Sequence, residues 1–159
     1  MYKLHLALSI ILIYFSQISL SATVIHAGLL IDGESSVPSP EMSIIIEGSK
    51  IEAIEAGFIT PDSDDEYIDL VGYTVLPGLM DMHVHLSSEY SKKSFQEKIT
   101  LNAGDYAIRA VANAEKTLLA GFTTVRNLGD SDGVTISLRN AIKKGIVLGP
   151  RIFSSGTTI

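Results

Sequence analysis

Two histidines one residue apart, His83 and His85, are the side chains in this sequence with the clearest chemical potential. If the apolar residues around them form a strand, side chains two positions apart project to the same face and the imidazoles lie side by side. Neutral imidazole is a common ligand of Zn²⁺, Mn²⁺ and Fe²⁺. Asp81 shares this face and could orient one of the rings. The spacing predicts a metal site, although two exposed histidines on an edge strand need no function.

The composition narrows the chemistry that this pair could support. The chain has 159 residues and no cysteine, which excludes disulfides and thiolate metal ligands. Its net charge of −6 lacks the basic surplus that a nucleic-acid binder needs. No histidine follows His85. Because a catalytic metal typically has three protein ligands and a water, we expect residues 1–159 alone to be inactive.

The N-terminus has the pattern of a secretory signal peptide over residues 1–21. Lys3 supplies a positive start, residues 4–20 are mainly apolar, and Ser19 and Ser21 are small residues before a cut after Ser21. A cut after Ala22 is an alternative, and an uncleaved membrane anchor is the main rival. Polar residues interrupt the apolar run, so we expect cleavage, export to the periplasm or beyond, and no membrane association afterwards.

The histidine pair must be positioned by the elements around it, and the rhythm of the sequence changes just before it. Residues 22–76 alternate short Val- and Ile-rich runs with Gly, Pro, Ser and Asp turns, which predicts a small, mostly antiparallel β-layer. The expected strands of this layer are residues 24–31, 43–47, 51–54 and 67–70.

From residue 77 onward, strands alternate with helices. We expect strands at 79–86, 122–127 and 150–154, a helix from residue 95 or 101 to 120, and another capped by Asp132. This alternation implies parallel strands, in either an open doubly wound sheet or a barrel. A complete (β/α)8 TIM barrel takes about 250 residues, so at most its first three strands are expected here. His83 and His85 would end the first strand, where such folds place ligands.

The segment around the histidines resembles a known family. Pro77 to His85 matches, without a gap, the Pro-Gly-hydrophobic-hydrophobic-Asp-x-His-x-His motif at the first barrel strand of the amidohydrolase superfamily of metal-dependent hydrolases. Residues 30–33 and 48–54 resemble its small β-sandwich. Residues 121–126 and 149–156 resemble the second and third strands of the branch that holds imidazolonepropionase-like enzymes and Xaa-Pro dipeptidases. The resemblance implies an N-terminal fragment that follows the predicted signal peptide (1–21) with a β-sandwich part (22–76) and the start of a TIM barrel (77–159).

The same resemblance implies a reaction in which metal-activated water attacks an amide, a cyclic amide or a dipeptide. The complete site would hold one or two divalent ions, with zinc favoured and Mn or Fe as alternatives. His83 and His85 would bind one of these ions, and Asp81 would orient an imidazole. A carboxylated lysine or acid, two histidines and an aspartate would come from later strands. The implied partner is a small-molecule substrate, and a homo-oligomer is possible.

The end of the second barrel strand holds further polar residues. Arg126 could bind a substrate carboxylate, although an arginine at a strand end is more often structural. Asn127 stands where relatives often have Asp, which argues against a carboxylate from this strand. Asp130 and Asp132 have the spacing of oxygen ligands, but the glycines around them favour a solvated turn or a helix cap.

A non-catalytic interpretation stays open on the sequence alone. The chain could be an exported remnant, or a binding module of amidohydrolase ancestry. The coding region after Ile159 discriminates between the two. A continuing frame with a strand-borne lysine, two histidines and an aspartate would favour the hydrolase, whereas a stop would favour the remnant.

Overall fold

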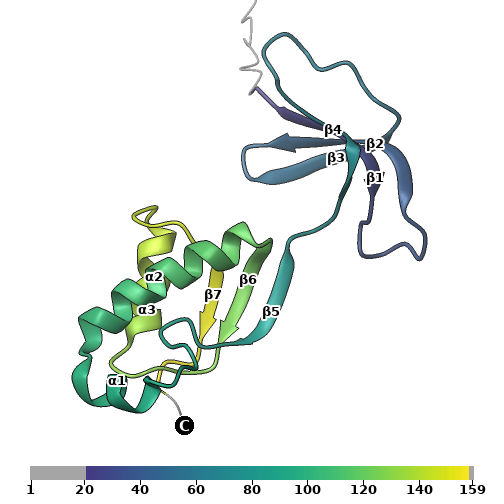
Figure 1. Ribbon diagram of the computed structural model, residues 1–159. Coiled ribbons are helices and arrows are strands. Elements are labelled where there is room, and N and C mark those ends of the chain that lie inside the picture. Colours follow the sequence, from purple (N-terminus) through teal and green to yellow (C-terminus); the bar gives the residue numbers. More distant parts are fainter. Residues whose placement is uncertain (1–20, 158–159) are drawn as a thin grey trace, which may run out of the picture. The chain divides into compact units, whose positions relative to one another are not determined.

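The computed structural model describes residues 21–157, which divide at Leu76 and Pro77 into two compact units (Figure 1). The predicted signal peptide lies outside the described residues, apart from Ser21. None of the helices between residues 21 and 157 combines the length and the apolar character that crossing a bilayer requires.

The first unit is a four-stranded sheet with the strand order β3-β2-β1-β4. Strand β2 pairs antiparallel with both β1 and β3, whereas β1 and β4 are parallel. The mostly antiparallel β-layer is therefore present, with β2 and β4 longer than predicted. Residues 21–76 form this single sheet, so the second layer of a sandwich stays a prediction. The strands are β1 (Thr23–Leu30), β2 (Ser39–Glu47), β3 (Lys50–Ala56) and β4 (Glu66–Val75).

A buried histidine, His26, lies in the core of this first unit. Its ring stacks on Phe58 and meets Tyr67 edge-on, with both centroid distances 4.8 Å. Its Nε2 lies 2.9 Å from the Ile59 carbonyl oxygen, and the Tyr67 hydroxyl lies 3.1 Å from Nδ1. Because a carbonyl only accepts, Nε2 carries a proton and the Tyr67 hydroxyl can donate to Nδ1. His26 is therefore a hydrogen-bonded core residue of the sheet.

The second unit is a parallel three-stranded sheet in the order β5-β6-β7, with helices between its strands. Figure 1 shows α2 and α3 together beside this sheet. Strands in chain order, joined by helices on one face, are the arrangement of the first part of an α/β barrel. This mixed α/β unit agrees with the predicted partial barrel. Its elements are β5 (Leu79–Val84), α1 (Ser94–Thr100), α2 (Ala103–Leu119), β6 (Phe122–Asn127), α3 (Val134–Lys143) and β7 (Arg151–Ser154).

Packing against the helices decides which way the strand residues point. Val125 of β6 and Ile152 of β7 are buried in one apolar cluster with residues of α2 and α3, and Val84 of β5 packs against it. Since neighbouring residues on a strand point to opposite faces, His83 and Arg126 project to the face that these helices leave uncovered. The cluster consists of Leu86, Ala110, Ala114, Val125, Val134, Leu138 and Ile152.

The sequence predicted the helices of this unit with one error. The helix expected up to residue 120 is α2, and the later of its two proposed starts, residue 101, is close to the observed start. Asn102 begins α2 in a capping box with Asp105: the Asn102 Oδ1 accepts from the Asp105 N–H, and the Asp105 Oδ2 accepts from the Asn102 N–H. The prediction that Asp132 caps α3 is wrong. Asp132 (φ +59°) and the cap residue Gly133 (φ +69°) are both left-handed, whereas a capping aspartate needs extended backbone.

Candidate metal centre

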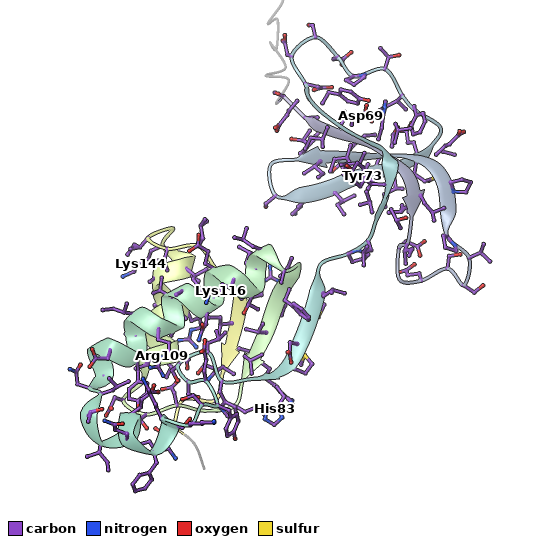
Figure 2. The ribbon with its side chains drawn as sticks, in the orientation of Figure 1. Asp69, Tyr73, His83, Arg109, Lys116 and Lys144 are labelled. Carbon is purple, nitrogen blue, oxygen red and sulfur yellow. The ribbon has the colours of Figure 1, made fainter. Side chains whose placement is uncertain are left out.

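His83 lies at the carboxyl end of β5 (Figure 2), and His85 directly follows the last residue of this strand. Their ring centroids are 5.4 Å apart and the ring planes meet at 67°. Both side chains are exposed. The structure thus places two imidazoles side by side at the end of a parallel strand, where water or an ion can reach both rings.

A backbone contact fixes which nitrogen of His85 carries the proton. Its Nδ1 lies 3.2 Å from the carbonyl oxygen of Gly129, in the loop after β6. A carbonyl can only accept, so Nδ1 donates and Nε2 of the neutral ring keeps its lone pair. This is the arrangement in which a metal-binding histidine is held by a partner at its other nitrogen. Gly129 therefore prepares His85 to bind a metal through Nε2.

The two residues predicted to assist the site both contact backbone groups. The Asp81 Oδ1 accepts a hydrogen bond from the His83 N–H at 2.9 Å. The Arg126 Nε donates to the Met82 carbonyl at 2.8 Å. Both side chains therefore hold the backbone of β5 next to His83. That Asp81 orients an imidazole and that Arg126 meets a substrate carboxylate stay predictions.

A buried polar network lies beside Leu86, the residue that follows His85. Asn127, at the end of β6, is fully buried, and its Oδ1 accepts from the Leu86 N–H at 2.9 Å. Its Nδ2 donates to the Thr135 hydroxyl at 3.3 Å. That hydroxyl also bonds Asp130 and lies 2.9 Å from the Ser154 Oγ. The network joins the ends of all three strands to the start of α3.

The hydroxyl of Thr135 can be assigned its hydrogen-bond roles from this network. Asp130 is an acceptor, so the single Thr135 hydroxyl proton goes to its Oδ2, which also accepts from the Thr135 N–H at 3.0 Å. The Thr135 oxygen then accepts from Asn127 and Ser154. Asp130 is only 7% exposed, so the solvated turn, one of the two predicted alternatives, is wrong for this residue. The structure supports the other alternative, a helix cap, because the Asp130 Oδ2 accepts from an N–H in the first turn of α3.

A cavity of about 570 Å³ opens beside His85. The loops after β5 and β6 and the start of α2 surround it, and the Asp130 Oδ1 has no hydrogen-bond partner among the described residues. The cavity is large enough for part of a small-molecule substrate. It is lined by His85, Ser87, Ser88, Lys98, Leu101, Asn102, Ala103, Tyr106, Gly129, Asp130, Ser131 and Asp132.

The donor groups at the site fit part of a metal centre. Two neutral imidazoles with reachable nitrogens suit a borderline ion such as Zn²⁺. In residues 21–157, no three His, Asp or Glu side chains converge in a way that could hold an ion. His83 and His85 could therefore contribute two ligands of a larger set.

Sequence reasoning missed the roles of Asn127 and Thr135. One signal was available for Asn127, because it lies two residues after the core residue Val125 and so shares its face. A polar residue at such a position needs buried partners. The partners themselves could not be named, since they come from the next loop and helix.

Comparison with known proteins identifies the unit that carries this site. Residues 74–159 match the model of the amidohydrolase family. The chain belongs to the amidohydrolase family. Within this family, it is 33% identical over 101 residues to a dihydroorotase of Lactobacillus leichmannii, a match that covers 64% of this chain and 20% of that protein.

Solved amidohydrolase-type structures also resemble the chain. A Xaa-Pro dipeptidase with bound methionine in its active site is 51% identical with a TM-score of 0.83, over 87% of this chain and 34% of that one. A prolidase complexed with N-methylphosphonate-L-proline is 32% identical with a TM-score of 0.74, over 86% and 32%. This amidohydrolase chain thus spans about a third of the length of these structures.

Proposed function

We propose that this chain supplies the first part of the active site of a metal-dependent hydrolase that cleaves carbon–nitrogen bonds in small amides. The observation that carries the proposal is the His83–His85 pair at the carboxyl end of β5, with rings 5.4 Å apart, inside the segment that matches the amidohydrolase family. The remaining ligands would come from residues outside 77–159 in a longer protein of this family.

The chain's own residues have distinct tasks in this proposal. His83 and His85 would hold a divalent ion, with zinc favoured and Mn or Fe as alternatives, and the Gly129 carbonyl keeps the proton of His85 on Nδ1. A bound ion would supply hydroxide near neutral pH and polarise the substrate carbonyl. The cavity beside His85 would receive part of the substrate.

Among small amides, we propose dipeptides that end in proline as the substrate class. The 51% identity and TM-score of 0.83 to the Xaa-Pro dipeptidase support this choice. Cyclic amides are the second candidate, because dihydroorotases are 31% to 35% identical to parts of this chain. Opening of a cyclic amide and cleavage of a dipeptide use the same metal-bound water, so the substrate-contacting loops decide between them.

Hydrolysis by the protein expressed from its whole coding region tests this proposal. With Zn²⁺ or Mn²⁺ restored, we expect turnover of Ala-Pro and Met-Pro, and far slower turnover of Ala-Leu and dihydroorotate. Residues 22–159 alone should bind metal weakly and turn over none of these substrates. Robust metal-dependent turnover by residues 22–159 would contradict our count of required ligands. No turnover by the metal-loaded whole protein would favour the binding module.

We further propose that the protein is exported and that its mature chain begins near Ala22. The basic start, the apolar run and the small residues at positions 19 and 21 support this proposal. N-terminal sequencing of protein recovered from the cell envelope, the periplasm or the medium should give a start at residue 22 or 23. Recovery solely as a cytosolic chain that starts at Met1 would contradict export.

A further inference from the structure

The register of β5 against β6 breaks at His83. Between the paired positions of Asp81 and Val84, the register shifts by one, so Met82 and His83 together face the single residue Arg126. Two residues opposite one form a β-bulge, and bulges beside active sites re-aim side chains. The peptide unit that joins Met82 to His83 is therefore displaced from the regular ladder.

Two side chains bind the polar groups of this displaced peptide unit. Its carbonyl, from Met82, accepts a hydrogen bond from the Arg126 Nε at 2.8 Å. Its N–H, from His83, donates to the Asp81 Oδ1 at 2.9 Å. One contact comes from the neighbouring strand and the other from β5 itself, so the peptide plane is held from both of its ends.

The orientation of this plane sets the direction of the His83 ring. The Cα of His83 is bonded directly to the nitrogen of the displaced peptide, and rotation of the plane turns its side chain relative to β5. His85 is fixed separately, through Gly129. Rotation of the Met82–His83 peptide would therefore change how the two imidazoles face each other.

We propose that Asp81 and Arg126 are positioning residues that clamp the Met82–His83 peptide and so hold the His83 imidazole in the orientation that metal binding requires. The inference rests on the proposed function only in taking the histidine pair as metal ligands. In this proposal, Asp81 accepts a hydrogen bond from the backbone amide of His83 rather than from an imidazole. The Nε of Arg126 likewise binds the backbone of β5 rather than a substrate carboxylate.

Variants of the full chain separate the clamp from roles that depend on charge. Asp81→Ala removes the acceptor, whereas Asp81→Asn keeps an Oδ1 acceptor and removes the charge. Arg126→Met removes the donor and keeps much of the stem, and Arg126→Lys keeps the charge but loses the Nε donor. Arg151→Met is the matched control, because Arg151 is an exposed arginine at the opposite end of the same sheet.

The first measurement is the affinity for Zn²⁺ alone, by competition with a chelating dye. Asp81→Ala and Arg126→Met should each weaken Zn²⁺ binding about 10- to 100-fold, the range seen when a partner that orients a ligand is lost. Asp81→Asn and Arg151→Met should stay close to the wild-type affinity. The double variant of Asp81→Ala and Arg126→Met should lose less than the product of the single effects, because both residues hold one peptide.

The second measurement is hydrogen exchange of the His83 amide in the metal-free protein. This amide should exchange faster in Asp81→Ala than in the wild type, and the protection should return in Asp81→Asn. Thermal melts identify any variant that has lost its fold, and Arg126→Lys replaces Arg126→Met if the latter unfolds. This measurement needs neither metal nor turnover. A protein that hydrolyses nothing would therefore contradict the proposed function, and hydrogen exchange would still test the clamp.

Three results would overturn the clamp. Equal loss of Zn²⁺ affinity in Asp81→Asn and Asp81→Ala would show that the carboxylate charge matters, not the acceptor for the His83 amide. Unchanged Zn²⁺ affinity in both Arg126→Met and Arg126→Lys would show that the Met82 carbonyl needs no partner. If Arg126→Met instead raised KM for Xaa-Pro dipeptides but not for uncharged amides, Arg126 would be a substrate-binding residue.

Discussion

Replacing His83 or His85 by alanine is expected to weaken Zn²⁺ binding at least about 100-fold and to abolish hydrolysis by the protein expressed from its whole coding region. Loss of a ligand should cost more than loss of a residue that orients one, which typically costs about 10- to 100-fold. The two rings lie 5.4 Å apart, and removal of either leaves a single imidazole at this position. Metal content by mass spectrometry and titration with Co²⁺, whose visible spectrum reports its ligands, measure the effect.

Gln96→Ala is the control for these two variants. Gln96 is an exposed polar residue of α1 in the same unit, so its replacement should leave both metal content and turnover unchanged. Thermal unfolding should differ little between the histidine variants and wild type, because both imidazoles are exposed and lie outside the apolar cluster. Full metal content in either histidine variant would contradict the assignment of the ligands.

Asn127→Leu is expected to destabilise the second unit by about 2 to 4 kcal/mol, because the substitution leaves buried hydrogen-bonding groups without partners. The Leu86 N–H loses its acceptor, and the Thr135 oxygen loses one donor. The volume of the side chain changes little, so the loss of hydrogen bonds dominates the effect. Urea unfolding followed by circular dichroism gives the change in the free energy of unfolding.

A second substitution at Asn127 tests the direction of its hydrogen bonds. Asn127→Asp keeps the acceptor for the Leu86 N–H but turns an oxygen toward Thr135, whose only proton goes to Asp130. Burial beside that carboxylate should raise the pKa of the new carboxyl in the folded state. The destabilisation relative to wild type should then be largest at pH values above the pKa of this new carboxyl in the folded state. It should shrink as the pH falls toward the pKa of an aspartate in the unfolded chain, about 3.9.

Asn140→Leu provides the matched control at an exposed position of α3. Its free energy of unfolding should lie within about 0.5 kcal/mol of wild type, as for most surface substitutions. If Asn127→Leu were as mild as this control, the buried network would contribute little to stability. Weaker Zn²⁺ binding in Asn127→Leu at temperatures where it remains folded would show that the network also positions His85.

The sequence by itself determined the parts of this protein that depend on local periodicity. Alternation of apolar and polar residues placed the strands of the first unit, and the change to strands between helical segments placed those of the second. Spacing by two predicted that His83 and His85 share one face. The unbroken run from Pro77 to His85 indicated the family, because a contiguous motif can be recognised without knowing its partners. The helix before Gly121 followed from apolar spacing and a terminating glycine.

The tertiary structure alone decided which groups support the histidines. The contact of His85 with Gly129 spans 44 residues, that of Leu86 with Asn127 spans 41, and that of Met82 with Arg126 spans 44. Each depends on the register of β5 against β6, which shifts by one at the bulge. Register is a property of two strands together, set by packing against the helices, so no periodicity within one strand reveals it. Asp81 and Arg126 were therefore visible in the sequence as polar residues, but their shared hold on one peptide of β5 was not.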